Sequence, residues 1–367
     1  MSYTFEMNNA HKDVGNPEIK RTSPVVEVFS AMVNGRQLPV YKDADVADKA
    51  VEYIKKLASR AGEGDLSASA ELNQIRREIL EPAVLEEIKL LGLFGNYTHL
   101  GAGDTIEREI WNVAGGAARI QALNGNVRVP AHSAVRYTVA PISIGAGYQV
   151  DYRTLADGDA SRENAAMQNV RTEMLNLATD YVMKVVYNAV KNATGVKYFA
   201  EAAGISQQSL DDIVKAVRRF GPTSILGAYA VVSQINNFVP YSNGTVTGIS
   251  DAVMEEIRKN GLVMNYKGSI VRETPAPYDL TKLNAAGNDF ATMLPEGLLY
   301  VLPAGMQSPV ATWSVGGLTS FSGNDVSTGR VLTRFDLVVA ADVAKGQEYK
   351  IGLLNDTNST PAASMAL

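Results

Sequence analysis

The sequence predicts an α+β protein, with helices and strands in largely separate stretches of the chain. Residues 105–150 and 291–355 alternate apolar and polar side chains, as half-buried strands do. Between them, the stretch from Ser161 to Thr194 contains neither proline nor glycine, which predicts one helix about 50 Å long. Residues 206–290 then mix helical and strand periods, as a small α/β lobe would.

The composition is that of an ordinary folded chain. The 367 residues include 34 basic and 39 acidic ones, a net charge of −5, and 46% are hydrophobic. This composition excludes disorder over most of the length, and the weak acidity argues against a dedicated nucleic-acid-binding surface. The absence of cysteine excludes disulfides, thiolate nucleophiles and cysteine zinc sites. Three histidines leave little material for a histidine metal site: His11, His99 and His132.

The first residues lack the basic-then-apolar order of a signal peptide. No apolar run approaches the ~18 residues that a membrane span needs. We therefore expect synthesis in the cytoplasm and no membrane partner.

The N-terminal part is expected to change from irregular to helical. Residues 1–45 are interpreted as an extended N-terminal arm, because three prolines interrupt them and Asn34-Gly35 is a turn signal. Residues 46–103 are expected to hold two helices, the second kinked at Pro82. Arg76-Arg77 on that second helix is interpreted as part of a solvated face.

Residues 104–150 are interpreted as a projecting β-hairpin. Asn124-Gly125 lies between two strand-like runs, which is the strongest short-range hairpin signal. Pro141 interrupts the alternation and suggests a bulge. Such a hairpin has few places to bury its faces within one subunit. We therefore expect Asn124 and Gly125 at the tip of an assembly interface, with Arg128 and Arg136 available to meet carboxylates of a neighbouring subunit.

Residues 151–205 are expected to form a spine helix that lies on a sheet. One apolar stripe runs along it at helical spacing. The side chains expected in its core are Val170, Met174, Tyr181 and Val185.

The remaining chain predicts a lobe and a set of closing strands. The lobe is expected to comprise residues 206–290. Within it, Ser209 with Asp212 resembles the start of a helix, and Ser250 is interpreted as the cap of another helix. The run from Ser224 to Val232 is interpreted as one buried strand. Residues 291–367 are expected to give closing strands and a loose tail. Their clearest signal is the alternation of apolar side chains from Val331 to Val339.

A search for catalytic and cofactor motifs finds no support for an enzyme. The phosphate-binding loop, the dinucleotide fingerprint and the G-x-S-x-G elbow are absent. His132-Ser133 would point to opposite faces of a strand. Asp157-Gly158-Asp159 is better interpreted as a helix cap than as a cation loop. We expect no catalytic residue, no metal site and no cofactor.

Four stretches carry a resemblance to a known family. They are YQVDYRTLADGD from Tyr148, LATDYVMKVVYNAVKNATG from Leu177, QQSLDDIVKAVRRF with SILGAYAVVSQI from Gln207, and YKGSIVRETPAP from Tyr266. In this order, and over roughly residues 70–355, they resemble the tailed-phage major capsid proteins of the Hong Kong 97-type fold.

The resemblance implies a shell protein without an active site, which assembles into the hexamers and pentamers of an icosahedral head around double-stranded DNA. It implies that residues 104–150 are the extended loop, that residues 151–205 and 291–367 build the peripheral domain, and that residues 206–290 build the axial domain. The implied partners are other copies, a portal, a separate scaffold if any, possible decoration proteins, and DNA held without sequence-specific binding. The implied location is the virion capsid, assembled in the host cytoplasm.

Two other functions stay open at this point. An encapsulin-like nanocompartment shell shares the same resemblance, so sequence patterning does not separate it from a phage capsid. Genes for a portal and a terminase beside this one would indicate a virus, whereas a cargo enzyme would indicate a compartment. An unrecognised α/β enzyme is disfavoured by the missing motifs.

Overall fold

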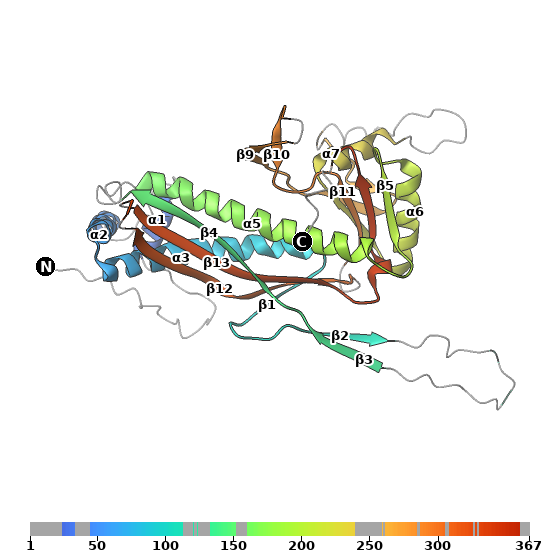
Figure 1. Ribbon diagram of the computed structural model, residues 1–367, viewed down its shortest axis with the longest axis horizontal. Coiled ribbons are helices and arrows are strands. Elements are labelled where there is room, and N and C mark those ends of the chain that lie inside the picture. The colour runs from blue at the N-terminus through green and yellow to red at the C-terminus, as the bar shows by residue number, and fades with distance from the viewer. Residues whose placement is uncertain are drawn as a thin grey trace. The chain divides into compact units, whose positions relative to one another are not determined.

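A computed structural model describes most of the chain as two compact units (Figure 1). One unit comprises Met1–Lys89, Ser143–Leu175 and Gly316–Val338, and the other comprises Leu90–Ile142, Asn176–Val315 and Val339–Leu367. The residues that the structure describes are 24–33, 45–112, 120, 123, 133–151, 160–238, 259, 261–284, 287–304, 308–325, 327–328 and 330–359.

The first unit begins with three helices, α1 (Pro24–Val33), α2 (Asp45–Gly62) and α3 (Leu66–Ile88). Helix α1 lies in the arm that was expected to be irregular, and this expectation is wrong there. Proline is favoured at the first position of a helix, where its missing N–H costs no hydrogen bond, so Pro24 begins a helix rather than breaking one. The turn signal Asn34-Gly35 lies outside the described residues.

Helix α3 has a clear start and a buried basic residue. The Asp65 carboxylate caps it by accepting hydrogen bonds from the backbone N–H of Ser67 (2.9 Å) and Ala68 (3.3 Å). The helix continues through Pro82 and ends in the 3₁₀ turn η1 (Lys89–Leu93). Arg76 is buried rather than solvated, because its guanidinium donates to Thr333 Oγ1 (3.3 Å) and lies 5.9 Å from the ring centre of Tyr148.

Long strands form a four-stranded sheet in the order β1 (Asn96–Leu100), β12 (Val310–Asp325), β13 (Arg330–Val343) and β4 (Ile142–Asp151). The predicted alternation on β13 is confirmed. Val331, Phe335, Leu337 and Val339 are buried, whereas Leu332 and Arg334 are exposed on the opposite face. This sheet therefore has one packed face and one open face.

The predicted long helix is confirmed as α5 (Ala160–Lys191), with 32 residues. Val170 and Met174 are buried as predicted, but Tyr181 and Val185 are only half-buried. The buried side chains of the C-terminal half are instead Val182, Met183, Val186, Tyr187 and Val190. The buried face rotates around the helix because the two halves pack against different elements: Arg171 pairs with Glu87 of α3, whereas the Met183 carbonyl accepts from Tyr300 of β11 (3.0 Å).

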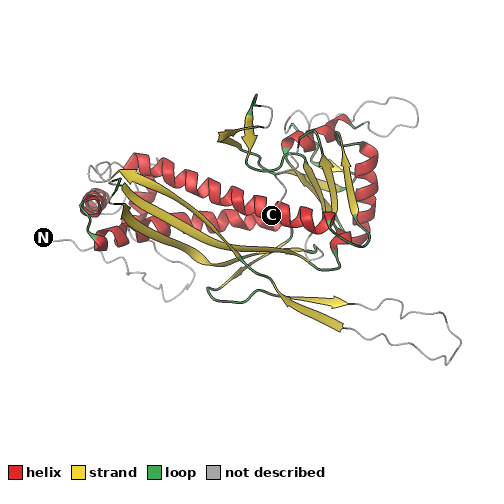
Figure 2. Ribbon diagram, viewed as in Figure 1, coloured by secondary structure: helices red, strands yellow, loops and turns green. Residues whose placement is uncertain are grey.

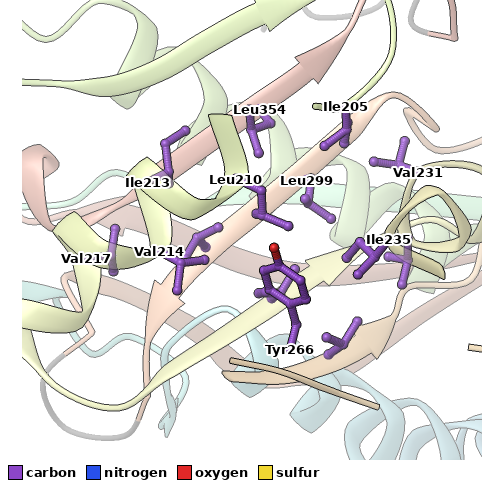
Figure 3. Close-up of a cluster of buried hydrophobic side chains, with 14 of the residues drawn as sticks. Ile205, Leu210, Ile213, Val214, Val217, Val231, Ile235, Tyr266, Leu299 and Leu354 are labelled. Carbon is purple, nitrogen blue, oxygen red and sulfur yellow. The ribbon is translucent and has the colours of Figure 1, made fainter. Parts of the chain in front are cut away.

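The second unit contains a six-stranded α/β sheet. Its order is β5 (Tyr198–Ala202), β14 (Gly352–Asp356), β11 (Leu298–Pro303), β6 (Thr223–Gly227), β8 (Ser269–Glu273) and β7 (Asn265–Tyr266). Helix α6 (Gln207–Val217), with the 3₁₀ turn η2 (Arg218–Phe220) after it, packs on this sheet through Leu210, Val214 and Val217 (Figure 3). Three of the six strands lie outside residues 206–290, so the lobe uses more of the chain than was expected.

Two local expectations in this unit are corrected. The cap of α6 is Ser206, whose hydroxyl accepts from the backbone N–H of Ser209 (3.2 Å), so Ser209 is the third residue of the helix. The run from Ser224 to Val232 is not one strand, because β6 ends at Gly227 and the short helix α7 (Tyr229–Val232) follows, continued by the 3₁₀ turn η3 (Ser233–Asn237). The helix expected after Ser250 lies outside the described residues.

Two further pairs of strands join no larger sheet (Figure 2). One pair is β2 (Glu107–Asn112) with β3 (Ser133–Thr138), and the other is β9 (Tyr278–Leu283) with β10 (Phe290–Thr292). Pro141 lies between β3 and β4, which belong to different sheets. The predicted interruption is therefore a change of sheet and not a bulge within one. A last 3₁₀ turn, η5 (Glu348–Lys350), precedes β14.

Candidate assembly surfaces

The hairpin β2–β3 is the first candidate surface. Its strands pair antiparallel in a regular register, from Glu107 opposite Thr138 to Asn112 opposite Ser133, so the predicted hairpin is confirmed at its base. Apolar side chains are displayed along it: Val135 is half exposed, and Ile120 and Leu123 beyond the strands are fully exposed. Asn124, Gly125 and Arg128, which were expected at the tip, lie outside the described residues.

Arg136, the fourth residue expected at an interface, lies on β3. Its guanidinium reaches the Glu109 carboxylate on β2 at 3.2 Å, directly across the hairpin. The pair is exposed to solvent, and such ion pairs contribute only about 0–1 kcal/mol. Within one chain Arg136 therefore already has a carboxylate partner, which a neighbouring carboxylate could replace at small cost.

Asp342, at the end of β13, holds both strands of the hairpin. Arg108 of β2 donates from Nη1 to Asp342 Oδ2 (2.8 Å) and to the Asp342 backbone oxygen (2.9 Å). Tyr137 of β3 donates from its hydroxyl to the same Oδ2 (2.6 Å). Arg108 and Tyr137 are opposite each other in the hairpin register. One carboxylate thus fixes the base of the hairpin, and we call these three residues the Asp342 clamp.

The electrostatics of the clamp favour a neutral tyrosine. Burial, together with the hydrogen bond to the Asp342 carboxylate, raises the pKa of Tyr137 to about 12. The Lys345 ammonium lies 4.5 Å from the ring centre of Tyr137, as a cation–π contact. At neutral pH the hydroxyl is therefore a permanent donor to Asp342.

The open face of the long sheet is the second candidate surface. A groove of about 850 Å³ lies over β4, β12 and β13. Its apolar walls are Phe321 and Leu332, both exposed, and Arg334 lies beside them. A Cβ atom on Gly147 would lie 2.6 Å from the Thr333 backbone oxygen, so glycine is needed for β4 to lie this close to β13. The groove is lined by apolar and small side chains among others, so it could take an extended segment of another molecule, and we call this surface the sheet groove.

Sequence reasoning did not find the Asp342 clamp or the sheet groove. Asp342 simply ends a strand, and no pattern connects it to Arg108 or Tyr137, which are far away in the chain. Leu332 gave a usable signal, because it is apolar on the face of β13 that otherwise carries Arg334 and Asp336.

In the part of the chain that the structure describes, no three His, Asp or Glu side chains come together as a metal site requires. Across the same part, every helix is too short or too polar to span a lipid bilayer.

A family model described as "SPbeta prophage-derived putative capsid protein YonB" matches residues 6–355, which is nearly the whole chain. The chain belongs to this family. The YonB family member described here is therefore a major capsid protein of a phage or prophage, with a structural role in the virion. This confirms the predicted class of protein, and the expected hairpin, long helix, α/β sheet and closing strands occur in the expected order.

Three solved structures show a distant similarity to this YonB family member. A capsid of a native GTA particle has 14% identity and a TM-score of 0.49 over 73% of this chain and 90% of that one. Mycobacterium phage Adephagia has 9% identity and a TM-score of 0.48 over 74% and 89%. A virus-like particle from Pyrococcus furiosus has 13% identity and a TM-score of 0.40 over 76% and 98%. Among the curated proteins, none matches the sequence significantly.

Proposed function

We propose that this capsid protein assembles into the hexamers and pentamers of an icosahedral head through its β2–β3 hairpin, which lies in the sheet groove of the next copy. The observation that carries this proposal is the exposure of Ile120 and Leu123 on a hairpin that joins no larger sheet. A two-stranded hairpin alone is marginally stable in water, so a partner surface would stabilise it.

The two surfaces fit a head-to-tail contact. The hairpin offers apolar side chains, and the sheet groove is lined by the exposed apolar side chains of Phe321 and Leu332 and by glycines. Because the hairpin and the groove are different patches, a contact between them is heterologous and propagates from copy to copy until a ring closes. Hexamers and pentamers are rings of this kind.

The same proposal includes what the shell contains and needs. Packaged double-stranded DNA would be enclosed without sequence-specific binding, because a net charge of −5 offers no overall attraction to phosphate. A scaffold, a portal and decoration proteins are proposed partners, and assembly is proposed to occur in the host cytoplasm. The prophage capsid family favours this function over an encapsulin-like compartment.

The test is a double variant, Ile120→Ser with Leu123→Ser, compared with Val196→Ser as a control. Val196 is also strongly exposed but lies after α5 and not on the hairpin. We expect both variants to fold, with the circular dichroism of the wild type, because the changed side chains contact solvent. The hairpin variant should form few or no closed shells in negative-stain electron microscopy, whereas the control should assemble as the wild type does.

A second variant replaces residues 113–132 by a short Gly-Ser linker. It should keep the folded subunit and lose the shells. Normal shells from either hairpin variant would exclude the hairpin from assembly. Loss of the fold in the linker variant would show that the hairpin belongs to the core of the subunit.

A further inference from the structure

The second pair of strands, β9–β10, is a compact hairpin with its own internal bracing. At its base the Met293 backbone N–H donates to the Pro277 oxygen (2.9 Å), and near its tip the Asn284 N–H donates to the Asp289 oxygen (2.8 Å). The rings of Tyr278 and Phe290 pack edge to face, 6.3 Å apart. These contacts hold the hairpin in one shape.

Helix α5 anchors this hairpin within the same unit. Asn176 of α5 donates from Nδ2 to the sulfur of Met293, which directly follows β10, at 3.1 Å. Asp279 accepts from the backbone N–H of Thr281 (3.0 Å) and so forms a turn within β9, where the register with β10 shifts. The hairpin is thus a fixed projection and presents a defined surface.

That surface is unusually apolar. Four large side chains on the two strands are exposed, by 51% at Tyr278, 71% at Leu280, 62% at Leu283 and 43% at Phe290. If a fully exposed large side chain presents about 200 Å², these fractions amount to roughly 450 Å². Apolar patches of this size on a single chain are usually binding surfaces.

The area corresponds to one side of a protein–protein interface. A standard interface covers about 800 Å² on each partner, and about 57% of that area is apolar. The hairpin alone therefore carries roughly the apolar area that one side needs. Charged residues, Lys282 and Asp289, lie on the same hairpin and are exposed, as at the polar rim of an interface.

We propose that the β9–β10 hairpin is a second contact between copies of this chain, separate from the β2–β3 hairpin. The proposal rests on the proposed function, because in a shell the partner present around every copy is another copy. The exposed apolar area of the hairpin matches that of one side of a standard protein–protein interface, and charged residues lie on the same hairpin as they do at the rim of such an interface. Both features argue for a protein partner. The occupant is thus a second copy of the chain, which covers Tyr278, Leu280, Leu283 and Phe290.

The test uses a thiol placed on the hairpin. The chain has no cysteine, so Leu280→Cys introduces a single reactive group. Leu66→Cys is the matched control, because Leu66 is 76% exposed and lies at the start of α3. Both thiols should react rapidly with a maleimide dye in disassembled subunits. In purified shells we expect Cys at 280 to react at least tenfold more slowly than in subunits.

A second measurement uses Leu280→Ser with Leu283→Ser. We expect a folded subunit whose half-maximal shell formation needs at least about tenfold more protein. Shells of the Leu280→Cys variant that are labelled as fast as its disassembled subunits, or an unchanged assembly midpoint in the double variant, would overturn the inference while leaving the proposed function intact. Protection that arises only when another protein is added would also overturn it. Failure of the wild type to form any shell would instead contradict the proposed function.

Discussion

Asp342 holds the β2–β3 hairpin through one carboxylate oxygen that accepts from Arg108 and from Tyr137. Arg108 and Asp342 form an ion pair that is mostly buried, since only 13% of the Arg108 side chain and 18% of the Asp342 side chain are exposed. Hydrogen bonds to a charged group in such a setting contribute about 1.5–3 kcal/mol, whereas exposed pairs contribute about 0–1 kcal/mol. A single residue at the end of β13 can therefore control the base of a hairpin that comes from a distant part of the sequence.

Replacing Asp342 by Ala should loosen the hairpin. We expect a loss of about 1–3 kcal/mol in the free energy of unfolding, because Tyr137 loses its acceptor and Arg108 keeps only backbone oxygens. Hydrogen exchange of the β2 and β3 amides should accelerate. The control is Glu52→Ala on α2, which breaks the exposed pair with Lys56 and should lower the free energy of unfolding far less. Equal effects of the two changes would mean that the clamp has no special role.

The raised pKa of Tyr137 predicts an alkaline loss of stability. Unfolded tyrosine ionises near pH 10, whereas the pKa of Tyr137 in the fold is about 12, mainly because of burial and the bond to Asp342. The neutral hydroxyl thus stabilises the fold fully below about pH 10, and this contribution is lost as the pH rises to about 12. Urea midpoints between pH 9 and 11.5 should fall less steeply in Tyr137→Phe. Some decrease of the urea midpoint with pH should remain in Tyr137→Phe, because the pKa of Tyr53 is also raised to about 12.

At the scale of elements, the sequence predicts the buried face of a helix or strand most reliably when that element packs against a single layer along its length. The alternation from Val331 to Val339 is correct because β13 has the same buried face along that length. On α5 the predicted face is correct at Val170 and Met174 and wrong at Tyr181, because the packing partner changes along the helix. The run from Ser224 to Val232 is mostly apolar across both β6 and α7, so its period does not distinguish strand from helix.

Two neighbouring valines of α5 test this account of the helix. Val186 is fully buried and Val185 is half-buried. Val186→Asp should cost more than about 3 kcal/mol, because it places an unpaired carboxylate in an apolar core, out of a total stability of about 5–15 kcal/mol. Val185→Asp should cost clearly less, since its carboxylate can reach water. Thermal unfolding followed by circular dichroism would rank the two variants, and the opposite order would show that the buried face is assigned wrongly.

At the scale of the whole molecule, strand partners come from far along the chain. The six-stranded sheet joins β5, β14 and β11, so residues 198–202, 352–356 and 298–303 become neighbours. Local periodicity predicts that these segments are strands but contains no information about which of them pair. For the same reason the candidate surfaces were only partly predicted: the hairpin has a local turn signal, whereas the sheet groove exists only after β4 has paired with β13, which is far away in the chain.

The last prediction concerns how copies add to a shell. Each chain offers two separate apolar hairpins, and in the proposed shell each of them contacts another copy. One contact alone is weak, but a copy that joins a growing ring makes several at once, and the combined affinity exceeds that of any single contact by orders of magnitude. We therefore expect single chains of 39.4 kDa and complete rings or shells, with few dimers or trimers between them. Mass photometry over a range of protein concentrations would count these species directly. A dominant stable dimer, or a 39.4 kDa chain that stays single under all salt and scaffold conditions, would contradict assembly by many weak contacts.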